Sequence, residues 1–222
     1  MNTIHLVPDW FYDFGVAFNI LFFVIALAVA HYSYKIYKLS YKNEVKFFSL
    51  GFGLISLSYL AKTLIFLTTF VEINEKLMGV IIEKLNTWGL FLTYSHLALF
   101  IIGIVTITYA TLKSNSIRIY LLLLLTSLSS ILLTTNKIRS FLALSAIYLL
   151  FISYHYGKEY IKYKNFKTSL IFIGFVLLFI SKLEVSLSSF YLSYLIEQGI
   201  ELVAYIFIAS GLALVLRKGK KQ

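Results

Sequence analysis

Cysteine is absent from the 222 residues of this chain, proline occurs once, at Pro8, and charged residues make up only 14%. Without cysteine the chain can form no disulfide, no thiolate metal site and no cysteine nucleophile. The single proline precedes the first long apolar segment, so none of the apolar segments contains the residue that most strongly breaks a helix. These absences favour long, uninterrupted helices.

Apolar residues are abundant and account for 59% of the chain, and aromatic residues account for 18%. This apolar content lies far above that of a soluble domain and predicts a multi-pass protein of the cell membrane, in contact with the lipid bilayer. A helix needs about 20 mostly apolar residues to cross the bilayer. Seven segments are candidates: 13–36, 46–70, 87–112, 117–135, 138–157, 167–187 and 193–216. We therefore expect an all-α integral membrane protein of seven helices, with one transmembrane domain over residues 1–222.

The cations predict how these helices are oriented. The formal net charge is +10, but the cations lie between apolar segments, so nucleic acid is not an expected partner. Most of the 20 lysines and arginines fall on one side of the predicted spans: Lys35, Lys38, Lys42, Lys46, Lys113, Arg118, Lys158, Lys162, Lys164, Lys167, Arg217, Lys218, Lys220 and Lys221. The acids on that side are Glu44 and Glu159. Because cytoplasmic loops carry excess lysine and arginine, we expect the N-terminus outside and the C-terminus in the cytoplasm.

The chain also contains a candidate internal repeat. The stretch "HYSYKIYKLSYKN" at 31–43 aligns with "SYHYGKEYIKYKN" at 153–165. Further alignment pairs Gly53 with Gly174, Lys62 with Lys182, and His96 with Glu201. Such a pattern indicates three helices, one connecting helix and three more in the same orientation, as in membrane proteins with parallel repeats. The alternative is interfacial composition shared without duplication. The layout is similar to that of SWEET sugar transporters, whose proline-glutamine motifs are missing here, so no residue is carried over.

Several polar residues fall in the outer halves of the predicted spans, where a charge is costly and marks a function or a buried partner. The set comprises Asn19, Lys62, His96, Lys182, Glu197 and Glu201. Glu197 and Glu201 are four residues apart and so share a helical face. Glu201 lies about two turns inside its span and needs a partner, for which Lys62, Lys182 and His96 are the candidates. If the set converges, it forms a charged pocket that is open to the outside and suits a small anionic or zwitterionic ligand.

Each of these residues also has a simpler interpretation. Lys62 could extend its ammonium group to the outer membrane interface, and this snorkelling is the favoured interpretation for Lys182 and its neighbour Glu184. A single histidine such as His96 is more often a hydrogen-bonded packing residue than a ligand. The sequence therefore leaves convergence and snorkelling as alternatives.

No enzymatic motif is present, and we expect neither catalysis nor a cofactor. Zinc hydrolases often carry HExxH on one helix, and this sequence lacks it. Haem would need histidines at one depth on facing helices, but His31 and His155 are flanked by tyrosines typical of the membrane interface. The seventh predicted span has no lysine before Lys218 that could form a retinal Schiff base.

One tract carries a resemblance to known proteins. The stretch "YSYKIYKLSYKNEVKFFSLGFGLISLSYLAK", residues 32–62, resembles the first helical hairpin of archaeal multi-helix membrane proteins and of seven-helix sensor modules fused to signalling domains. The resemblance implies a sensor, and we expect its output to pass to a separate signalling or complex partner on the basic cytoplasmic loops. The expected function is ligand binding or signalling. The alternatives are a small-solute or ion transporter and a structural subunit of a membrane complex.

Overall fold

The computed structural model describes residues 9–74, 79–114, 116–187 and 191–219, with side chains over 14–67, 88–114, 116–187 and 196–217. The regular structure of these ranges is α-helical, which confirms the expected all-α class. The elements are α1 (Asp9–Ser40), α2 (Asn43–Asn74), α3 (Gly79–Leu112), α4 (Ile117–Leu133), α5 (Lys137–Tyr163), α6 (Phe166–Leu187) and α7 (Tyr191–Gly219).

Each predicted apolar segment coincides with a helix, but α1 and α5 extend beyond their segments into polar sequence. Each continues until a residue adopts the left-handed conformation, Tyr41 at φ 54° and Lys164 at φ 45°. The backbone N–H groups of these two residues donate to the carbonyls of Tyr37 and Tyr160, each over 2.7 Å, and so close the last turn. Such left-handed residues are a common way to end a helix, although glycine is the usual choice.

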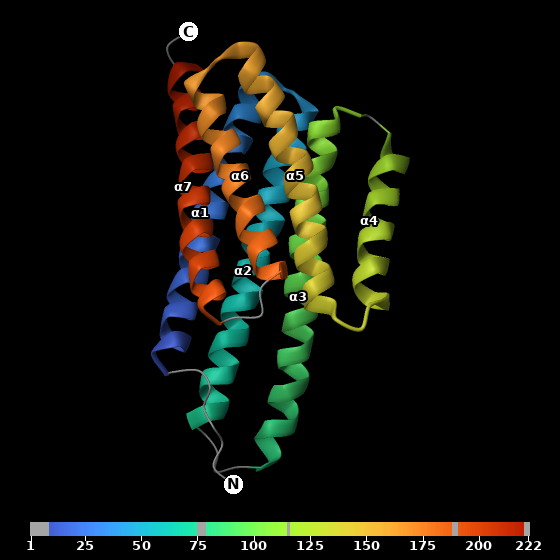
Figure 1. Ribbon diagram of the computed structural model, residues 1–222, viewed down its shortest axis with the longest axis vertical. Coiled ribbons are helices and arrows are strands. Elements are labelled where there is room, and N and C mark those ends of the chain that lie inside the picture. The colour runs from blue at the N-terminus through green and yellow to red at the C-terminus, as the bar shows by residue number, and fades with distance from the viewer. Residues whose placement is uncertain (1–8, 75–78, 115, 188–190, 220–222) are drawn as a thin grey trace.

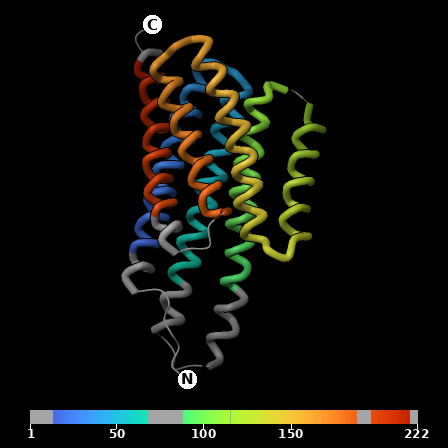
Figure 2. Tube along the Cα trace, in the orientation of Figure 1, coloured from blue at the N-terminus to red at the C-terminus, as the bar shows by residue number. Residues whose placement is uncertain are grey.

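The helices form one bundle with α4 at its edge (Figure 1). Helix α2 packs against α1 and α3, α6 packs against α5 and α7, and the α1–α7 and α3–α5 contacts join these two sets. In the described part of the chain, α4 packs only against α3 and α5. Successive helices run in opposite directions, so α1, α3, α5 and α7 all end at the same end of the bundle (Figure 2).

Six helices are long and apolar enough to cross a membrane by their length and composition: α1, α2, α3, α5, α6 and α7. Helix α4 is the shorter apolar helix, with 17 residues. At 1.5 Å per residue it spans about 25 Å, against about 30 Å for the hydrocarbon core. The chain is therefore a multi-pass membrane protein by the composition of its helices.

Small residues allow two pairs of helices to approach closely. A Cβ atom added to Gly51 of α2 would lie 2.5 Å from Ile107 Cγ1 and 2.8 Å from the carbonyl oxygen of Gly103, both on α3. A Cβ atom at Gly174 of α6 would lie 2.8 Å from the carbonyl oxygen of Ala204 on α7. Because lipid is as apolar as a leucine side chain, close packing of this kind holds membrane helices together.

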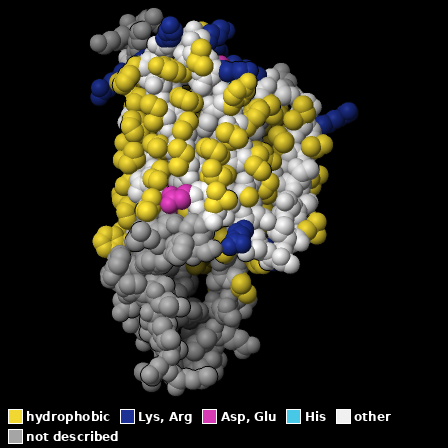
Figure 3. All heavy atoms as spheres, viewed as in Figure 1, with side chains coloured by type: hydrophobic (Ala, Val, Ile, Leu, Met, Phe, Trp, Pro, Cys, Tyr) yellow, Lys and Arg dark blue, Asp and Glu magenta, His cyan; other side chains and the backbone are white. Residues whose placement is uncertain are grey.

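Lysine and arginine side chains gather at one end of the molecule (Figure 3). This end, which we call the basic end, carries the exposed side chains of Lys35, Lys38, Lys42, Lys113 and Lys158. It is the end at which α1, α3 and α5 stop, and α2 and α6 begin there. The opposite half of the bundle contains the polar residues singled out in the sequence.

Candidate functional site

An ion cluster lies inside the bundle between α6 and α7. The Lys182 ammonium donates to Oε1 of Glu197 over 2.7 Å and lies 2.8 Å from Oε1 of Glu201. All three residues are buried, with exposures of 4%, 4% and 1%. We call these three residues the Lys182 cluster. The snorkelling expected for Lys182 is wrong, because two carboxylates on the neighbouring helix are within hydrogen-bonding reach of its ammonium, which therefore stays inside.

Both carboxylates reach the Lys182 ammonium because of their spacing on α7. Glu197 and Glu201 are four residues apart, so both point from one face of the helix towards α6. A buried ion is stable only when its partners are close and well oriented. One ammonium faces two carboxylates here, so negative charge is in excess when all three groups are ionised. The Phe100 ring, 5.5 Å from the Lys182 nitrogen, adds a cation–π contact from α3.

Two buried tyrosines extend the cluster into a chain of hydrogen bonds. The Tyr59 hydroxyl donates to Oε1 of Glu201 over 2.8 Å, and it lies 3.1 Å from the Tyr205 hydroxyl. A phenol has one hydrogen to donate. Since Tyr59 gives its hydrogen to Glu201, Tyr205 must donate to Tyr59. The chain therefore runs from Tyr205 through Tyr59 to Glu201, and it links α2 to α7.

A cavity of about 240 Å³ lies beside the cluster. Its polar wall includes Tyr59, Lys62, His96, Lys182 and Glu197, which come from α2, α3, α6 and α7. Four of the six residues predicted from sequence thus line one cavity, and a fifth, Glu201, is bonded to Lys182. We call this space the Lys182 cavity. It lies in the half of the bundle away from the basic end.

His96 is held in place by Ser58 of α2. The Ser58 hydroxyl lies 2.6 Å from His96 Nδ1 and donates to the His96 carbonyl oxygen over 3.1 Å. The ring also packs against Phe100 and Phe141, with centroid distances of 6.1 and 5.9 Å. His96 is therefore a hydrogen-bonded packing residue, the simpler of the two interpretations, and it also lines the cavity.

Asn19 of α1 is the predicted site residue that neither belongs to the Lys182 cluster nor lines the Lys182 cavity. It is fully buried, and neither its amide nitrogen nor its amide oxygen has a hydrogen-bond partner among the described residues. One turn further along, Phe22 packs against the rings of Tyr59 and Tyr205, with centroids 5.1 and 5.8 Å away. Asn19 thus shares a helical face with a residue that contacts the tyrosine chain.

Tyr59 is the site residue that the sequence analysis overlooked. Tyrosines of membrane proteins are enriched at the bilayer interface, where the ring is apolar and the hydroxyl is hydrated. Tyr59 and Tyr205 lie well inside their apolar segments, so each hydroxyl needs a partner within the protein. The position of Tyr59, far from both ends of its predicted span, is the sequence signal that could have identified it as a site residue.

Over the described residues, no group of three or more histidine, aspartate or glutamate side chains could hold a metal ion. The cluster instead offers charged groups of both signs beside a partly open cavity. No family model, curated protein or solved structure matches the chain.

Proposed function

We propose that this chain is a seven-span membrane protein that binds a small anionic or zwitterionic ligand in the Lys182 cavity and acts as a receptor or sensor. The observation that carries the proposal is the partly open cavity of about 240 Å³, whose wall offers Lys62, His96, Lys182 and Glu197. Most ligand sites are largely apolar with a few converging polar groups. Here Leu97 and Phe141 supply apolar wall beside the charged groups.

The chemistry of the wall supports an anionic or zwitterionic ligand. An anionic group placed in the cavity meets the Lys62 and His96 side chains, while a ligand ammonium meets Glu197. Lys182 is already fixed by two carboxylates, and His96 is fixed by Ser58. Groups that are held in place before binding lose little conformational freedom when the ligand arrives.

The same pairing counts against a structural subunit. Intramembrane charges that hold subunits together pair across the interface between chains. Lys182 pairs with Glu197 and Glu201 of its own chain, and all three are buried within it. The ion pairs of the cluster therefore form within one chain.

In this proposal α4 also crosses the membrane, and the basic end faces the cytoplasm, with the N-terminus outside. The gathering of lysines at one end of the bundle supports this orientation. The Lys182 cavity then belongs to the outer half, and the basic cytoplasmic loops are the surface on which a separate signalling partner docks.

The proposal includes a three-helix repeat, with α1–α3 matching α5–α7 and α4 connecting them. The close approach of Gly51 to α3 has its counterpart in the approach of Gly174 to α7. The two left-handed residues, Tyr41 and Lys164, are separated by the same number of positions in the sequence as Gly51 and Gly174. This register matches Gly174 with Gly51, two positions from the Gly53 used in the sequence alignment.

Transport of a small solute is the second candidate, favoured by a second cavity at the basic end. That cavity, of about 290 Å³, is lined by Phe48 and Tyr156 among others. A layer of rings separates it from the Lys182 cavity: Phe48 packs against Phe52 at 4.9 Å, and Phe175 stacks on Tyr156 at 5.3 Å. In a carrier that works by alternating access, cavities on the two sides of an apolar barrier would serve as the paths to a central site.

Native mass spectrometry with an absorption spectrum, on protein purified gently from membranes, tests the binding proposal. Wild type is compared with Lys62→Ala, and Lys158→Ala serves as a control because Lys158 is exposed at the basic end. Wild type and Lys158→Ala should retain a non-lipid small molecule that Lys62→Ala loses. Wild-type protein that carries only lipid, or that arrives with a fixed protein partner, contradicts the proposal.

Sealed liposomes distinguish the two candidates. A carrier moves a labelled solute across the membrane, whereas a receptor binds it and leaves it outside. Accumulation of the bound molecule by purified protein, abolished in Lys62→Ala and kept in Lys158→Ala, supports the carrier and contradicts the receptor.

A further inference from the structure

The basic end contains a feature that membrane topology does not explain. Lysines are expected on the cytoplasmic side of a membrane protein, but Glu44 and Glu159 are the two acids among them. The structure brings both to one place, although Glu44 lies at the start of α2 and Glu159 near the end of α5. Both line the cavity of about 290 Å³.

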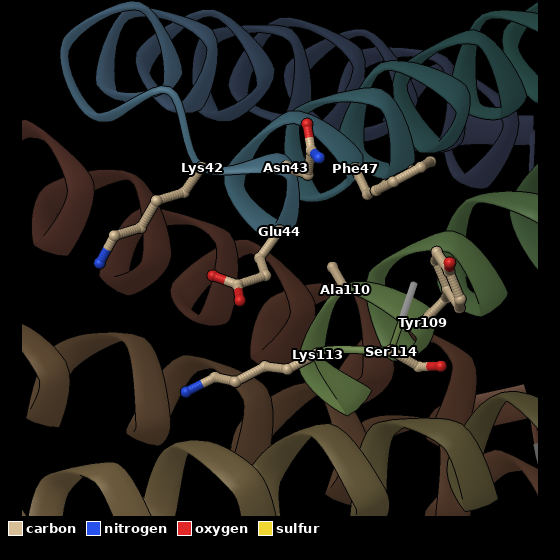
Figure 4. Close-up of a pocket in the computed structure, with 8 residues that line it drawn as sticks. All are labelled: Lys42, Asn43, Glu44, Phe47, Tyr109, Ala110, Lys113 and Ser114. Atoms are coloured by element: carbon tan, nitrogen blue, oxygen red, sulfur yellow. The ribbon is translucent and has the colours of Figure 1, made fainter. Parts of the chain in front are cut away.

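This cavity adjoins another of about 330 Å³, and the two share Lys42, Glu44 and Lys113 in their walls. We call the joined space the basic-end cavity. Its mouth is charged, and Figure 4 shows the Glu44 carboxylate between the side chains of Lys42 and Lys113. Its wall also includes apolar side chains such as Phe48 and Leu212, and the buried hydroxyl of Ser33. The space is therefore amphipathic, with charges of both signs at the mouth and apolar side chains in its wall.

The charges at the mouth are partly paired. Lys113 donates to Oε1 of Glu159 over 3.0 Å. This hydrogen bond raises the pKa of Lys113 above its ordinary value, and the charges of Glu159 and Glu44 act in the same direction. Lys113 therefore keeps its positive charge at neutral pH.

Other polar groups that line the cavity have no such partner. Among the described residues, the Glu44 carboxylate makes no ion pair within 4.0 Å. The Ser33 hydroxyl is fully buried, lines the cavity and has no hydrogen-bond partner in the described part of the chain. Buried polar groups nearly always find a partner, so this hydroxyl can hydrogen-bond to whatever fills the cavity, whether ligand or water.

We propose that the basic-end cavity is a second binding site, for a small amphipathic zwitterion such as an α-amino acid with an apolar side chain. The ligand ammonium lies against Glu44, the ligand carboxylate against Lys42 and Lys113, and its apolar body against Phe48 and Leu212. This inference stands apart from the proposed function, because it concerns the opposite end of the bundle and none of the residues of the Lys182 cavity.

Three ligands that share one skeleton and differ in charge test the assignment. L-Phenylalanine is the zwitterion, phenethylamine carries the ammonium alone, and 3-phenylpropanoate carries the carboxylate alone. Their affinities for the full-length protein in detergent are measured by isothermal titration calorimetry. We expect phenylalanine to bind most tightly, because it is the ligand that can use both charged groups at the mouth.

Single substitutions then locate the bound ligand. Glu44→Gln should weaken phenylalanine and phenethylamine by about tenfold or more, since it removes a charged hydrogen-bond acceptor. Lys42→Gln should weaken phenylalanine and leave phenethylamine unchanged. Glu184→Gln, a substitution of the same type outside the basic-end cavity, should change neither affinity. Unfolding temperatures of all variants establish that they are folded.

Three results would overturn the inference. The first is an absence of binding for all three ligands, which would mean that water fills the cavity. The second is tighter binding of 3-phenylpropanoate than of phenylalanine, which would indicate a site for anions. The third is phenylalanine binding that survives Glu44→Gln and is lost in Lys62→Ala, because the ligand would then occupy the Lys182 cavity.

Discussion

The hydroxyl of Tyr59 on α2 lies 2.8 Å from Oε1 of Glu201 on α7, and this hydrogen bond joins residues 142 positions apart. It couples the two tightly packed helix pairs, α2–α3 and α6–α7, through one carboxylate. Glu201 also lies 2.8 Å from the Lys182 ammonium, so the same oxygen serves both contacts. Any ligand that disturbs the Lys182 cluster therefore acts on the contact between the two halves of the bundle.

Removal of the Lys182 charge should strongly destabilise the protein. In Lys182→Met two buried carboxylates lose their ammonium partner, and loss of one member of a buried ion pair costs about 3–5 kcal/mol. The free energy of unfolding in detergent measures the effect. Lys182→Met combined with Glu197→Gln and Glu201→Gln should recover part of the loss, because no unpaired carboxylate then remains. A triple variant less stable than Lys182→Met would contradict the assigned pairing.

The ion pair between Lys113 and Glu159 at the basic end should contribute much less to stability than the buried Lys182 cluster. The side chains of Lys113 and Glu159 are 53% and 34% exposed, so water screens their attraction. Exposed pairs contribute about 0–1 kcal/mol. Glu159→Gln should therefore lower the free energy of unfolding far less than Lys182→Met does. Equal losses in the two variants would mean that the burial of the Lys182 cluster has no energetic consequence.

The two tyrosines of the hydrogen-bond chain should differ in their contribution. Tyr59→Phe removes a donor to a carboxylate and should lower the free energy of unfolding by about 1–2 kcal/mol. Tyr205→Phe removes a bond between two neutral hydroxyls and should cost about 0.5 kcal/mol. Both are measured by unfolding in the same detergent. A larger effect at Tyr205 would contradict the chain of hydrogen bonds from Tyr205 through Tyr59 to Glu201.

Gly51 and Gly53 make a matched pair for the contact between α2 and α3. Gly51→Ala places a methyl group 2.8 Å from the Gly103 backbone oxygen, so the helices must separate, and overpacking of this kind costs about 1–3 kcal/mol. A Cβ atom at Gly53 meets no atom within 4 Å. Gly53→Ala should therefore be neutral or raise stability by up to about 1 kcal/mol through its helix propensity. Similar effects at the two positions would refute the close approach.

The absence of cysteine makes the proposed orientation directly testable. Ser40→Cys places a single thiol at the basic end, and Thr135→Cys places one between α4 and α5 at the other end. A maleimide that cannot cross membranes should label Thr135→Cys in intact cells, and it should label Ser40→Cys only after the membrane is opened. The reverse pattern would place the basic end outside.

The sequence predicted the helices because their signal is local. A long apolar run without proline has few alternatives to a membrane helix, since every backbone group must find a partner in lipid. The helix ends were less predictable. Helices α1 and α5 continue through polar sequence to Tyr41 and Lys164, and neither is the glycine that marks the usual left-handed helix end.

The candidate site was predictable as a set of residues but not as a set of contacts. A charged side chain inside an apolar segment is conspicuous in any sequence, which is why Lys182 and Glu201 were identified from composition alone. Whether Lys182 extends to the interface or turns inward depends on where α7 lies, and a single helix contains no such information. The sequence analysis missed Tyr59 for the same reason, because its hydrogen-bond partner, Glu201, is on a helix near the other end of the chain.

Local composition by itself therefore determined that this is an all-α protein with several apolar helices, because hydrophobicity and helix formation depend on neighbours in the chain. The tertiary structure alone decided that Lys182 pairs with Glu197 and Glu201, that Tyr59 joins them, and that Glu44 and Glu159 share a cavity. Those relationships depend on how distant helices pack, and packing is decided by close contacts such as that of Gly51 with Gly103, which act between helices rather than along them.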